Sequence, residues 1–312
     1  MQRVLLTGGA GYIGSHLAHL LVSKNYKVRI LDNLSNSNLL SIPNGIEFIN
    51  GSILDTEILR EVLKGVDIVI HLAAKKSVSE SINNPELYFE QNSMGTLNLL
   101  CAMRRASVEK FIFSSTAAVY KPECSKFASE ESPISPISPY GRSKSFGEDL
   151  VLSFTNNYGL RAIILRYFNV VAFESYYREP AFKNTGLFPS LQRAYKERLP
   201  FEIFGKTFST PDGTAIRDFV HVADLSLAHL LALEKLDAIP DSDIYNVGTN
   251  SGYSIQEVVN AFQDRVNNQI EVRIAATREG DIPISIADSS KIRAELDWAP
   301  RYDLAEIVKC YV

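Results

Sequence analysis

The sequence predicts an α/β protein built on a doubly wound parallel sheet, and two features of its first half predict this fold. Short, nearly continuous apolar runs alternate with longer stretches of helical periodicity. Strands that are apolar along their whole length are typical of a parallel sheet covered by helices on both faces. A glycine-rich turn also follows the first apolar run, at the place where doubly wound sheets bind ligands.

The predicted elements follow one another in a regular order. Apolar β-rich runs predict strands at residues 4–7, 28–32, 47–50, 67–73, 110–115 and 161–168. Helical patterns lie between them, most clearly at residues 14–24 and 85–106. The run "SPISPISP" at residues 132–139 predicts a stiff surface loop, because each residue before a proline is pushed out of the helical region.

The alternation of strands and helices ends near residue 172. The next stretch, "FESYYREPAFKNTG", is loop-like and leads into shorter elements. We expect residues 1–172 to form one domain, to which a segment near 214–248 returns. Residues 173–312 are expected to form a smaller C-terminal α/β domain that binds the substrate. A chain of 312 residues is long enough for two domains.

Composition limits the partners of the protein. The chain is 46% hydrophobic and 22% charged, and its net charge of −4 gives no basic field for nucleic acid or an anionic membrane. No apolar run approaches the ~18 residues of a membrane span. The opening "MQRVLLTGG" runs into a predicted strand and lacks the apolar core of a signal peptide. We therefore expect a soluble cytoplasmic protein.

Cysteine and histidine spacing predicts no metal site. Cys101, Cys124 and Cys310 are odd in number, far apart and without a CxxC motif, so we expect reduced thiols. His16 and His19 lie on one predicted helix, but no third ligand follows at a suitable spacing. We expect both histidines to pack or to face solvent.

The stretch "TGGAGYIGSH" predicts a dinucleotide site. Gly8, Gly11 and Gly14 have GxxGxxG spacing between the first strand and the first helix, where backbone N–H groups can approach a pyrophosphate. A plain strand–helix turn remains the alternative for the glycines. Asp32 ends the second strand, where a carboxylate accepts from ribose hydroxyls and repels a 2′-phosphate, which favours NAD over NADP. The alternative for Asp32 is a strand-ending or capping role.

The stretch "SPYGRSK" predicts an acid–base pair. Tyr140 and Lys144 are four residues apart, so on a helix they share a face. A phenol beside an ammonium ionises more easily than its ordinary pKa near ~10 allows. The alternatives without a catalytic role are that Tyr140 is an aromatic residue at the rim of a cleft and that Lys144 is a solvated surface charge.

With the glycine turn and the Tyr–Lys pair in one chain, the sequence resembles the short-chain dehydrogenase/reductase family. Further motifs resemble its extended, nucleotide-sugar branch, and specifically the UDP-glucose 4-epimerases, over nearly the whole chain. In order, these motifs are "HLAA" (71–74), "FSSTAAVY" (113–120), "PYGRSK" (139–144), "RYFNV" (166–170), "DGTAIRDFVHVADL" (212–225), "YNVGTNSGYS" (245–254) and "REGDIPISIADSSKI" (278–292).

The resemblance implies a Rossmann-type NAD-binding domain, a UDP-sugar substrate, a homodimer and an isomerase. UDP-glucose and UDP-galactose would be interconverted by oxidation at C4, rotation of the 4-keto sugar and re-reduction. Tyr140 would take the proton of the 4-hydroxyl group, and Lys144 would lower the pKa of Tyr140 and contact the nicotinamide ribose. Thr116 would bridge the 4-hydroxyl group and Tyr140.

The resemblance also implies binding residues. The cofactor positions are Gly8, Gly11, Tyr12, Ile13, Gly14, Asp32, Asn33, Asn36, Ser52, Ile53, Leu72, Lys76, Asn92, Tyr140, Lys144 and Phe168. The substrate positions are Thr116, Asn169, Leu187, Glu202, Ile203, Phe204, Arg217, Arg278, Asp281 and Ser285. His221 is expected to order its segment rather than to act in catalysis.

The sequence departs from the family pattern at four positions. Ser52 replaces the acid that binds adenine, which is expected to loosen NAD. Lys121 stands where a glycine is usual, Gly186 where an asparagine is common, and Phe219 where a tyrosine is common. These departures concern affinity more than reaction type.

Rival activities remain open to different degrees. Ala117 and Ala118 cannot transfer a proton, which argues against a 4,6-dehydratase that needs an acid pair there. UDP-uronate and UDP-N-acetylhexosamine 4-epimerases remain alternatives, as does a non-catalytic NAD-sensing regulator. Ser285 lies at the position of the family's gate beside the sugar 2-substituent, and a small residue there predicts that N-acetylated UDP-sugars are also substrates.

Overall fold

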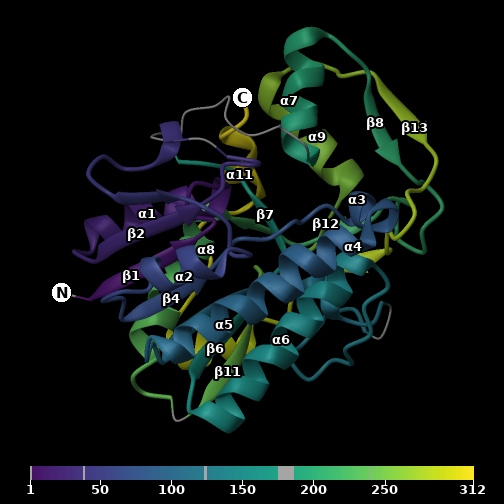
Figure 1. The fold of residues 1–312 in the computed structure, drawn as a ribbon. Helices are drawn as coiled ribbons and strands as arrows, with labels where there is room; N and C mark the ends of the chain where they lie inside the picture. The colour runs from purple at the N-terminus through teal and green to yellow at the C-terminus, as the bar shows by residue number, and fades with distance from the viewer. Residues whose placement is uncertain (1, 38, 123–124, 175–185, 240) are drawn as a thin grey trace.

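A computed structural model describes residues 2–37, 39–122, 125–174, 186–239 and 241–312 (Figure 1). Cys124 lies outside the described residues, as does most of the loop predicted after residue 172. Among the described residues, no helix combines the length and the apolar character needed to cross a membrane.

A seven-stranded parallel sheet forms the centre of the protein, in the order β3-β2-β1-β4-β5-β6-β11. The strand order reverses between β1 and β4, and ligands of doubly wound sheets bind at such a point. The strands are β1 (Arg3–Thr7), β2 (Lys27–Asp32), β3 (Glu47–Asn50), β4 (Ile68–His71), β5 (Lys110–Thr116), β6 (Arg161–Tyr167) and β11 (Ser242–Val247). The predicted doubly wound α/β fold is confirmed.

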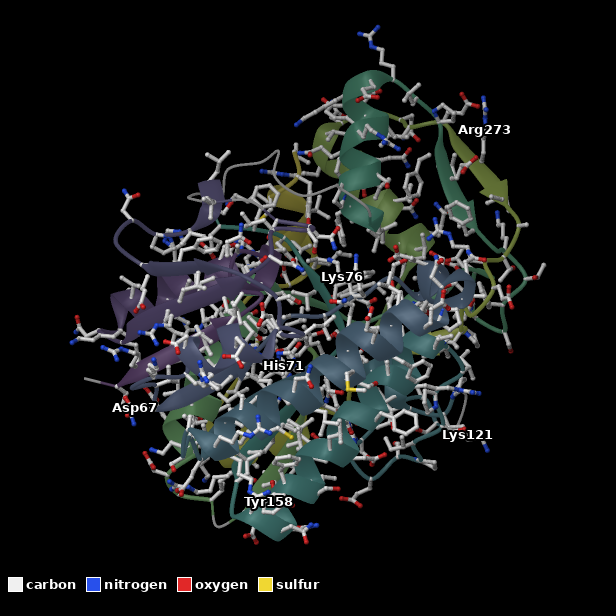
Figure 2. All side chains as sticks on the ribbon, viewed as in Figure 1. Asp67, His71, Lys76, Lys121, Tyr158 and Arg273 are labelled. Atoms are coloured by element: carbon white, nitrogen blue, oxygen red, sulfur yellow. The ribbon has the colours of Figure 1, made fainter. Side chains whose placement is uncertain are left out.

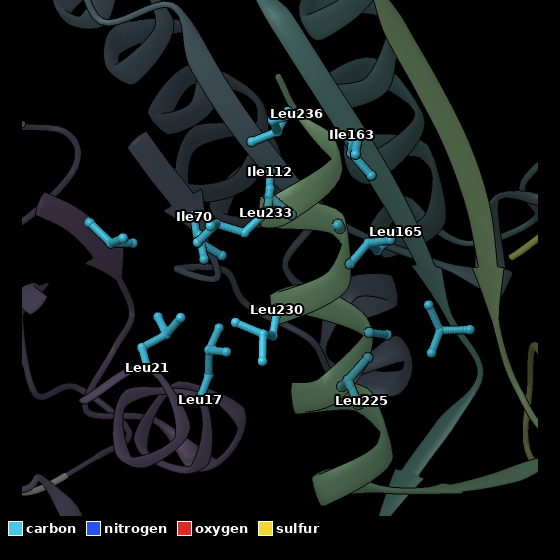
Figure 3. Close-up of a cluster of buried hydrophobic side chains, with 14 of the residues drawn as sticks. Leu17, Leu21, Ile70, Ile112, Ile163, Leu165, Leu225, Leu230, Leu233 and Leu236 are labelled. Atoms are coloured by element: carbon cyan, nitrogen blue, oxygen red, sulfur yellow. The ribbon is translucent and has the colours of Figure 1, made fainter. Parts of the chain in front are cut away.

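Helices cover both faces of this sheet because its strands are apolar on both sides. On β1, for example, Leu6 packs in one buried cluster and Leu5 in the other. The first cluster includes leucines of α1 (Tyr12–Ser23) and α8 (Val222–Lys235), which pack on isoleucines of the central strands (Figure 3). The second face is covered by α2 (Thr56–Val62), α5 (Gly95–Arg105) and α6 (Pro139–Tyr158).

The first six predicted strands and the first helix match the structure closely. Strand β4 is shorter than predicted, because the chain leaves the sheet after His71. The helical pattern of residues 85–106 is divided into α4 (Pro85–Tyr88), the π-helix η2 (Phe89–Met94) and α5. π-helical turns occur often at functional sites.

Helix α6 begins where the proline-rich loop ends. Pro139 occupies its first turn, where a missing N–H costs nothing. The Ser138 hydroxyl caps the helix by accepting from the N–H of Gly141 at 3.1 Å. Gly159 ends the helix in the left-handed conformation, at a φ of 70°.

A second core lies above the carboxyl ends of the strands (Figure 1). It combines α7 (Leu187–Glu197), α9 (Ile255–Val266), α11 (Leu304–Lys309) and the parallel pair β8 (Phe201–Phe204) and β13 (Val272–Ala275). Helix α10 (Ser290–Leu296) and Trp298 instead pack on the first core. The remaining elements are β7 (Asn169–Val171), β9 (Ile216–Arg217), β10 (Phe219–His221), β12 (Tyr253–Ser254), β14 (Ile284–Ser285), α3 (Val78–Asn83), and the 3-10 turns η1 (Leu39–Ser41) and η3 (Ala117–Val119).

Candidate active site

The glycine turn after β1 fits a group that needs close backbone approach. Gly8 has a φ of 71°, and a Cβ atom there would lie 2.6 Å from the backbone nitrogen of Ala73. A Cβ atom on Gly14 would lie 2.4 Å from the carbonyl oxygen of Gly8. Any side chain at either position would therefore push the turn away from helix α1 or from the segment after β4.

The N-terminus of α1 opens at this turn. Gly11 is its N-cap, no side chain of the described residues caps it, and its first turn carries no acidic residue. The backbone N–H groups of this first turn and the positive end of the helix dipole favour a phosphate here. Tyr12 and Ile13 follow; the Tyr12 hydroxyl group donates to the carbonyl of Ala172 and so ties α1 to the segment after β7.

Asp32 lies at the carboxyl end of β2 with 9% of its surface exposed. Its carboxylate accepts from the N–H of Ala10 at 3.1 Å, the N–H of Leu34 at 2.8 Å and the hydroxyl of Ser37 at 2.9 Å. The acid is therefore fixed beside the glycine turn. Asn33 and Asn36 follow on the exposed side of this loop.

The end of β3 carries a hydroxyl group where the family pattern has an acid. The Ser52 hydroxyl oxygen accepts from the N–H of Leu54 at 3.2 Å. The side chain of Ile53 is buried in the core, and a Cβ atom on Gly95 would lie 2.5 Å from it. Only the backbone of Ile53 is left to face a ligand.

The segment after β4 is clamped by the π-helix η2. The amide group of buried Asn92 accepts from the N–H of Lys75 at 2.8 Å, and donates to the carbonyl of Lys75 at 3.0 Å and the hydroxyl of Ser143 at 2.9 Å. This clamp fixes the chain between Leu72 and Lys76 against α6. Burial lowers the pKa of Lys76, which lies near the middle of the view in Figure 2.

Thr116, Tyr140 and Lys144 meet at the carboxyl end of β5. Thr116 is the last residue of the strand, and the other two lie one turn apart on α6. The Thr116 hydroxyl group is hydrogen-bonded to Tyr140. Lys144 is 3% exposed, and its ammonium lies 4.4 Å from the centre of the Phe113 ring. The structure thus brings together the three residues predicted to act in catalysis.

Two opposing effects set the pKa values of this pair. Burial raises the pKa of the Tyr140 phenol, and the hydrogen bond from Thr116 opposes that rise. Burial lowers the pKa of Lys144 to about 7, and the negative charge of Glu148 opposes that fall. The expectation that Lys144 lowers the pKa of Tyr140 is therefore not met in this structure, because burial raises the pKa of the phenol. The lysine, near its titration point, and the phenol still lie one helical turn apart, as an acid–base pair requires.

Tyr88 is a neighbour of the site that sequence reasoning missed. Its ring meets the Tyr140 ring edge-on, with centroids 6.2 Å apart. Its hydroxyl donates to Glu80 at 2.8 Å and accepts from the N–H of Ser77 at 3.0 Å. Tyr88 thereby fixes both the segment after β4 and one side of Tyr140. The run "PELYF" gives no sign of this, because the contact crosses between elements.

A pocket opens next to Thr116, near several of the residues predicted to bind the substrate. Ala117, Lys121, Phe168 and Ser285 line it together with neighbouring residues of the same segments. Ser285 lies in β14 and pairs in register with Arg217 of β9. The structure therefore places the predicted gate residue in the same pocket as residues that follow Thr116. The side chain of Phe168 packs with Tyr120 and Ala287 at this end.

Two arginines lie further along the same end. Nη2 of Arg217 is 3.8 Å from Oδ1 of Asp281, and burial lowers the pKa of Arg217 while Asp281 opposes this. The guanidinium carbon of Arg278 lies 3.5 Å from the centre of the Phe204 ring. Guanidinium forks suit phosphate oxygens, and a stacked ring and guanidinium suit a planar base. Next to Phe204 on β8, Glu202 is exposed and Ile203 is buried.

The remaining predicted substrate residues lie at the start of short elements. The Asn169 amide group donates to the carbonyl of Asp218 at 3.0 Å, which joins β7 to β10. Leu187 is the first residue of α7, directly after Gly186 with its φ of 149°. His221 caps α8 by accepting from the N–H of Ala223 at 3.0 Å, so it orders its segment as expected.

The described residues contain no group of three or more histidine, cysteine, aspartate or glutamate side chains placed to hold a metal ion. Burial lowers the pKa of His16 to about 4, and its Nδ1 lies 2.8 Å from the carbonyl oxygen of Tyr12. His16 is thus a packed histidine of α1. His19 is half-buried, and its Nε2 lies 3.2 Å from the carbonyl oxygen of Ser41.

The sequence profile of the NAD dependent epimerase/dehydratase family matches residues 4–248 of this chain. The chain belongs to this family. A UDP-glucose 4-epimerase of Azospirillum brasilense is 39% identical over 311 residues, which cover 96% of this chain and 88% of that protein. The Tyr–Lys pair, the glycine turn and the pocket thus lie in a member of an NAD-dependent family.

Solved structures of similar proteins share the whole fold. A UDP-glucose-4-epimerase of Stenotrophomonas maltophila, with bound NAD and formylated UDP-arabinopyranose, superposes with a TM-score of 0.94 at 34% identity, covering 100% of this chain and 97% of that one. The UDP-Glc/GlcNAc 4-epimerase of Campylobacter jejuni gives a TM-score of 0.86 at 37% identity and covers 100% and 98%.

Proposed function

We propose that the protein is an NAD-dependent isomerase that interconverts UDP-glucose and UDP-galactose. The Tyr140–Lys144 pair beside Thr116 carries this proposal, because it provides a proton acceptor at the carboxyl end of the sheet. Ala117 and Ala118 follow Thr116 and provide no second acid, so elimination of water from the sugar has no catalyst there. The match to relatives named UDP-glucose 4-epimerase supports the same reaction.

The residues around the glycine turn fit NAD. The pyrophosphate would lie on the turn and the uncapped N-terminus of α1, and the adenosine ribose on Asp32. When bound, NAD supplies the hydride acceptor and donor for C4 of the sugar. The buried, fixed carboxylate of Asp32 leaves room for hydroxyl groups and disfavours an added phosphate.

The chain's own residues move and hold the proton of the reaction. Tyr140, as phenolate, takes the proton of the sugar 4-hydroxyl group and later returns it. Lys144, when protonated, stabilises the phenolate, and Thr116 donates to Tyr140 and orients the hydroxyl group. Arg217 and Arg278 hold the diphosphate in place. The 4-keto sugar can then rotate about its bond to the diphosphate and present its other face.

We also propose that UDP-N-acetylglucosamine and UDP-N-acetylgalactosamine are substrates. Ser285 is a small residue on the wall of the pocket, and its hydroxyl can pair with an acetamido group. The similarity to a structure named UDP-Glc/GlcNAc 4-epimerase supports this wider range. A UDP-uronate remains the rival substrate, and Lys121 on the same pocket is the feature that favours it.

We further propose that the protein is a cytoplasmic homodimer with the domain division expected from the sequence. Phe146 on α6 and Met94 on η2 are 55% and 51% exposed, although both are large and apolar. Phe89 packs edge-on against Phe146 at 5.9 Å, so the two elements present one apolar surface. A second copy of the chain would bury it. Sedimentation of the wild type and of Phe146→Glu tests this dimer.

Product analysis by NMR tests the reaction directly. The protein, supplied with NAD, is incubated separately with UDP-glucose, UDP-N-acetylglucosamine and UDP-glucuronate. We expect an equilibrium mixture of 4-epimers without accumulation of NADH. A 6-deoxy-4-keto product, a decarboxylated sugar, or NADH formed in proportion to substrate would contradict the proposal, and an unchanged sugar with bound NAD would indicate a regulator.

A further inference from the structure

A buried ion pair lies one helical turn beyond Lys144. Nε of Arg166 donates to Oε1 of Glu148 at 3.0 Å, and Nη2 donates to Oε2 at 2.6 Å. The two side chains are 4% and 5% exposed. Such a two-point contact is the strongest geometry for an arginine and a carboxylate.

The other polar atoms of the pair are also satisfied. The hydroxyl of Ser115, next to Thr116 on β5, donates to Glu148. Nη1 of Arg166 donates to the Tyr120 hydroxyl at 3.0 Å and the carbonyl of Glu130 at 3.2 Å. The pair therefore joins α6 to β5 and β6. A buried ion pair adds little stability compared with well-packed apolar residues, so its presence beside a reactive lysine calls for another reason.

Three functional groups follow one stripe of α6. Tyr140, Lys144 and Glu148 are each four residues apart and share one face of the helix. The carboxylate of Glu148 lies on the helix with Lys144, whereas the guanidinium of Arg166 lies on β6 and reaches toward Tyr120. The negative end of the ion pair is thus the end nearer to Lys144 along the helix.

Apart from Tyr140, which is neutral until its phenol ionises, the other described groups that face Lys144 bring no negative charge. His71 of β4 is buried, and its pKa falls to about 3 through burial and the charge of Lys144, so it stays neutral. The Phe113 ring of β5 lies beneath the ammonium. From η2, Asn92 contributes an amide that is bound to Ser143 of α6. Glu148 is the group that raises the pKa of Lys144 against the effect of burial.

We propose that Glu148 is a positioning residue for the reaction: its carboxylate, held by Arg166 and Ser115, keeps Lys144 protonated. Lys144 can then stabilise the phenolate of Tyr140. The inference rests on the proposed roles of Tyr140 and Lys144. It gives the ion pair two roles: it joins α6 to the sheet, and it sets the protonation state of Lys144.

The charge state of Lys144 can be measured without turnover. NMR of Cε-labelled lysine in the NAD-loaded protein, assigned by the signal lost in Lys144→Met, gives the pKa of Lys144. Glu148→Gln removes the charge and keeps the shape, and we expect it to lower that pKa by about one unit or more. The falling limb of kcat/KM against pH should move to lower pH by the same amount.

Arg166→Gln is the matched control, because it breaks the same ion pair and leaves the carboxylate in place. We expect it to cost similar stability and to hold or raise the pKa of Lys144, and Glu148→Asp should restore most of the wild-type value. An unchanged pKa in Glu148→Gln, or an equal fall in both variants, would overturn the proposal. If Glu148→Gln does not fold, the pKa of Lys144 in Arg166→Gln decides: an unchanged or higher value supports the proposal, and a lower value overturns it. A wrong substrate assignment would show only in product analysis.

Discussion

Replacing Asp32 by asparagine is expected to reduce strongly the preference for NAD over NADP. Asp32 is 9% exposed and its carboxylate is held by the N–H groups of Ala10 and Leu34 and by the Ser37 hydroxyl. It therefore cannot swing away from a phosphate on the ribose 2′-position. Asparagine keeps the shape and an acceptor oxygen but carries no charge.

The size of the effect follows from charge separation. Two unit negative charges about 4 Å apart, at an effective dielectric constant of about 20, repel by about 4 kcal/mol. This energy corresponds to a ratio of about a thousand between the two dissociation constants. We expect NAD to bind the wild type about a thousandfold more tightly than NADP, and the ratio to fall to about tenfold in Asp32→Asn.

Calorimetry with both nucleotides, on protein freed of bound cofactor, measures these ratios. Asp55→Asn is the control, because Asp55 also accepts two backbone N–H groups, of Glu57 and Ile58, but caps α2 outside the glycine turn. The control should keep the wild-type ratio. Equal affinities in the wild type, or an unchanged ratio in Asp32→Asn, would refute the role of Asp32.

Three further outcomes are expected. Tyr140→Phe should lower kcat by ~10²–10⁴-fold with little change in NAD affinity, because general acid–base groups contribute about that much; near-wild-type turnover in stopped-flow assays would contradict this. Ser285→Tyr should lower kcat/KM for N-acetylated sugars selectively, and an unchanged ratio to the plain sugars would show that Ser285 is not the gate. Burial lowers the pKa of His71 to about 3 and of His229 to about 4, below the ordinary 6.5, so the folded state binds fewer protons than the unfolded chain. Stability should therefore fall as pH drops below 6.5, by about 1.4 kcal/mol per pH unit for each histidine, and a flat melting temperature from pH 6.5 to 4.5 would argue against it.

The sheet could be predicted because its signals are local. Each central strand is a short apolar run bounded by turn residues, and six of the seven were placed within a few residues. Strand β11, "SDIYNV", is the exception, since it lies between loops and has no such run before Ile244. It joins the sheet by parallel pairing with β6, and its Tyr245 and Val247 side chains are buried in the first core.

That Tyr140 and Lys144 lie together could also be predicted, because helical spacing fixes which side chains share a face. Their partners could not, since they come from distant segments. Tyr88 reaches Tyr140 across 52 positions of the chain, and Arg166 reaches Glu148 across 18. No periodicity links such residues. The predicted substrate residues have no local signal of their own apart from the family resemblance, because β9 and β14 have two residues each and leave no pattern.

The four departures from the family pattern fall into two groups once the structure is known. Phe219 is 4% exposed and packs edge-on against Phe188 at 5.3 Å, so it serves the second core. Gly186 has a φ of 149°, which strains any other residue, so the backbone before α7 requires it. Ser52 and Lys121 instead lie at opposite ends of the proposed ligand path, after β3 and on the wall of the pocket.

Ser52 and Lys121 are separate from the proposed catalytic residues. Neither Ser52 nor Lys121 touches Thr116, Tyr140 or Lys144 among the contacts of the described residues. Changes at the two ends of the site alter how tightly cofactor and sugar are held, whereas the proton transfer depends on groups fixed by β5 and α6. The departures should therefore appear in the affinities for NAD and for the sugar substituent and leave the chemical step unchanged.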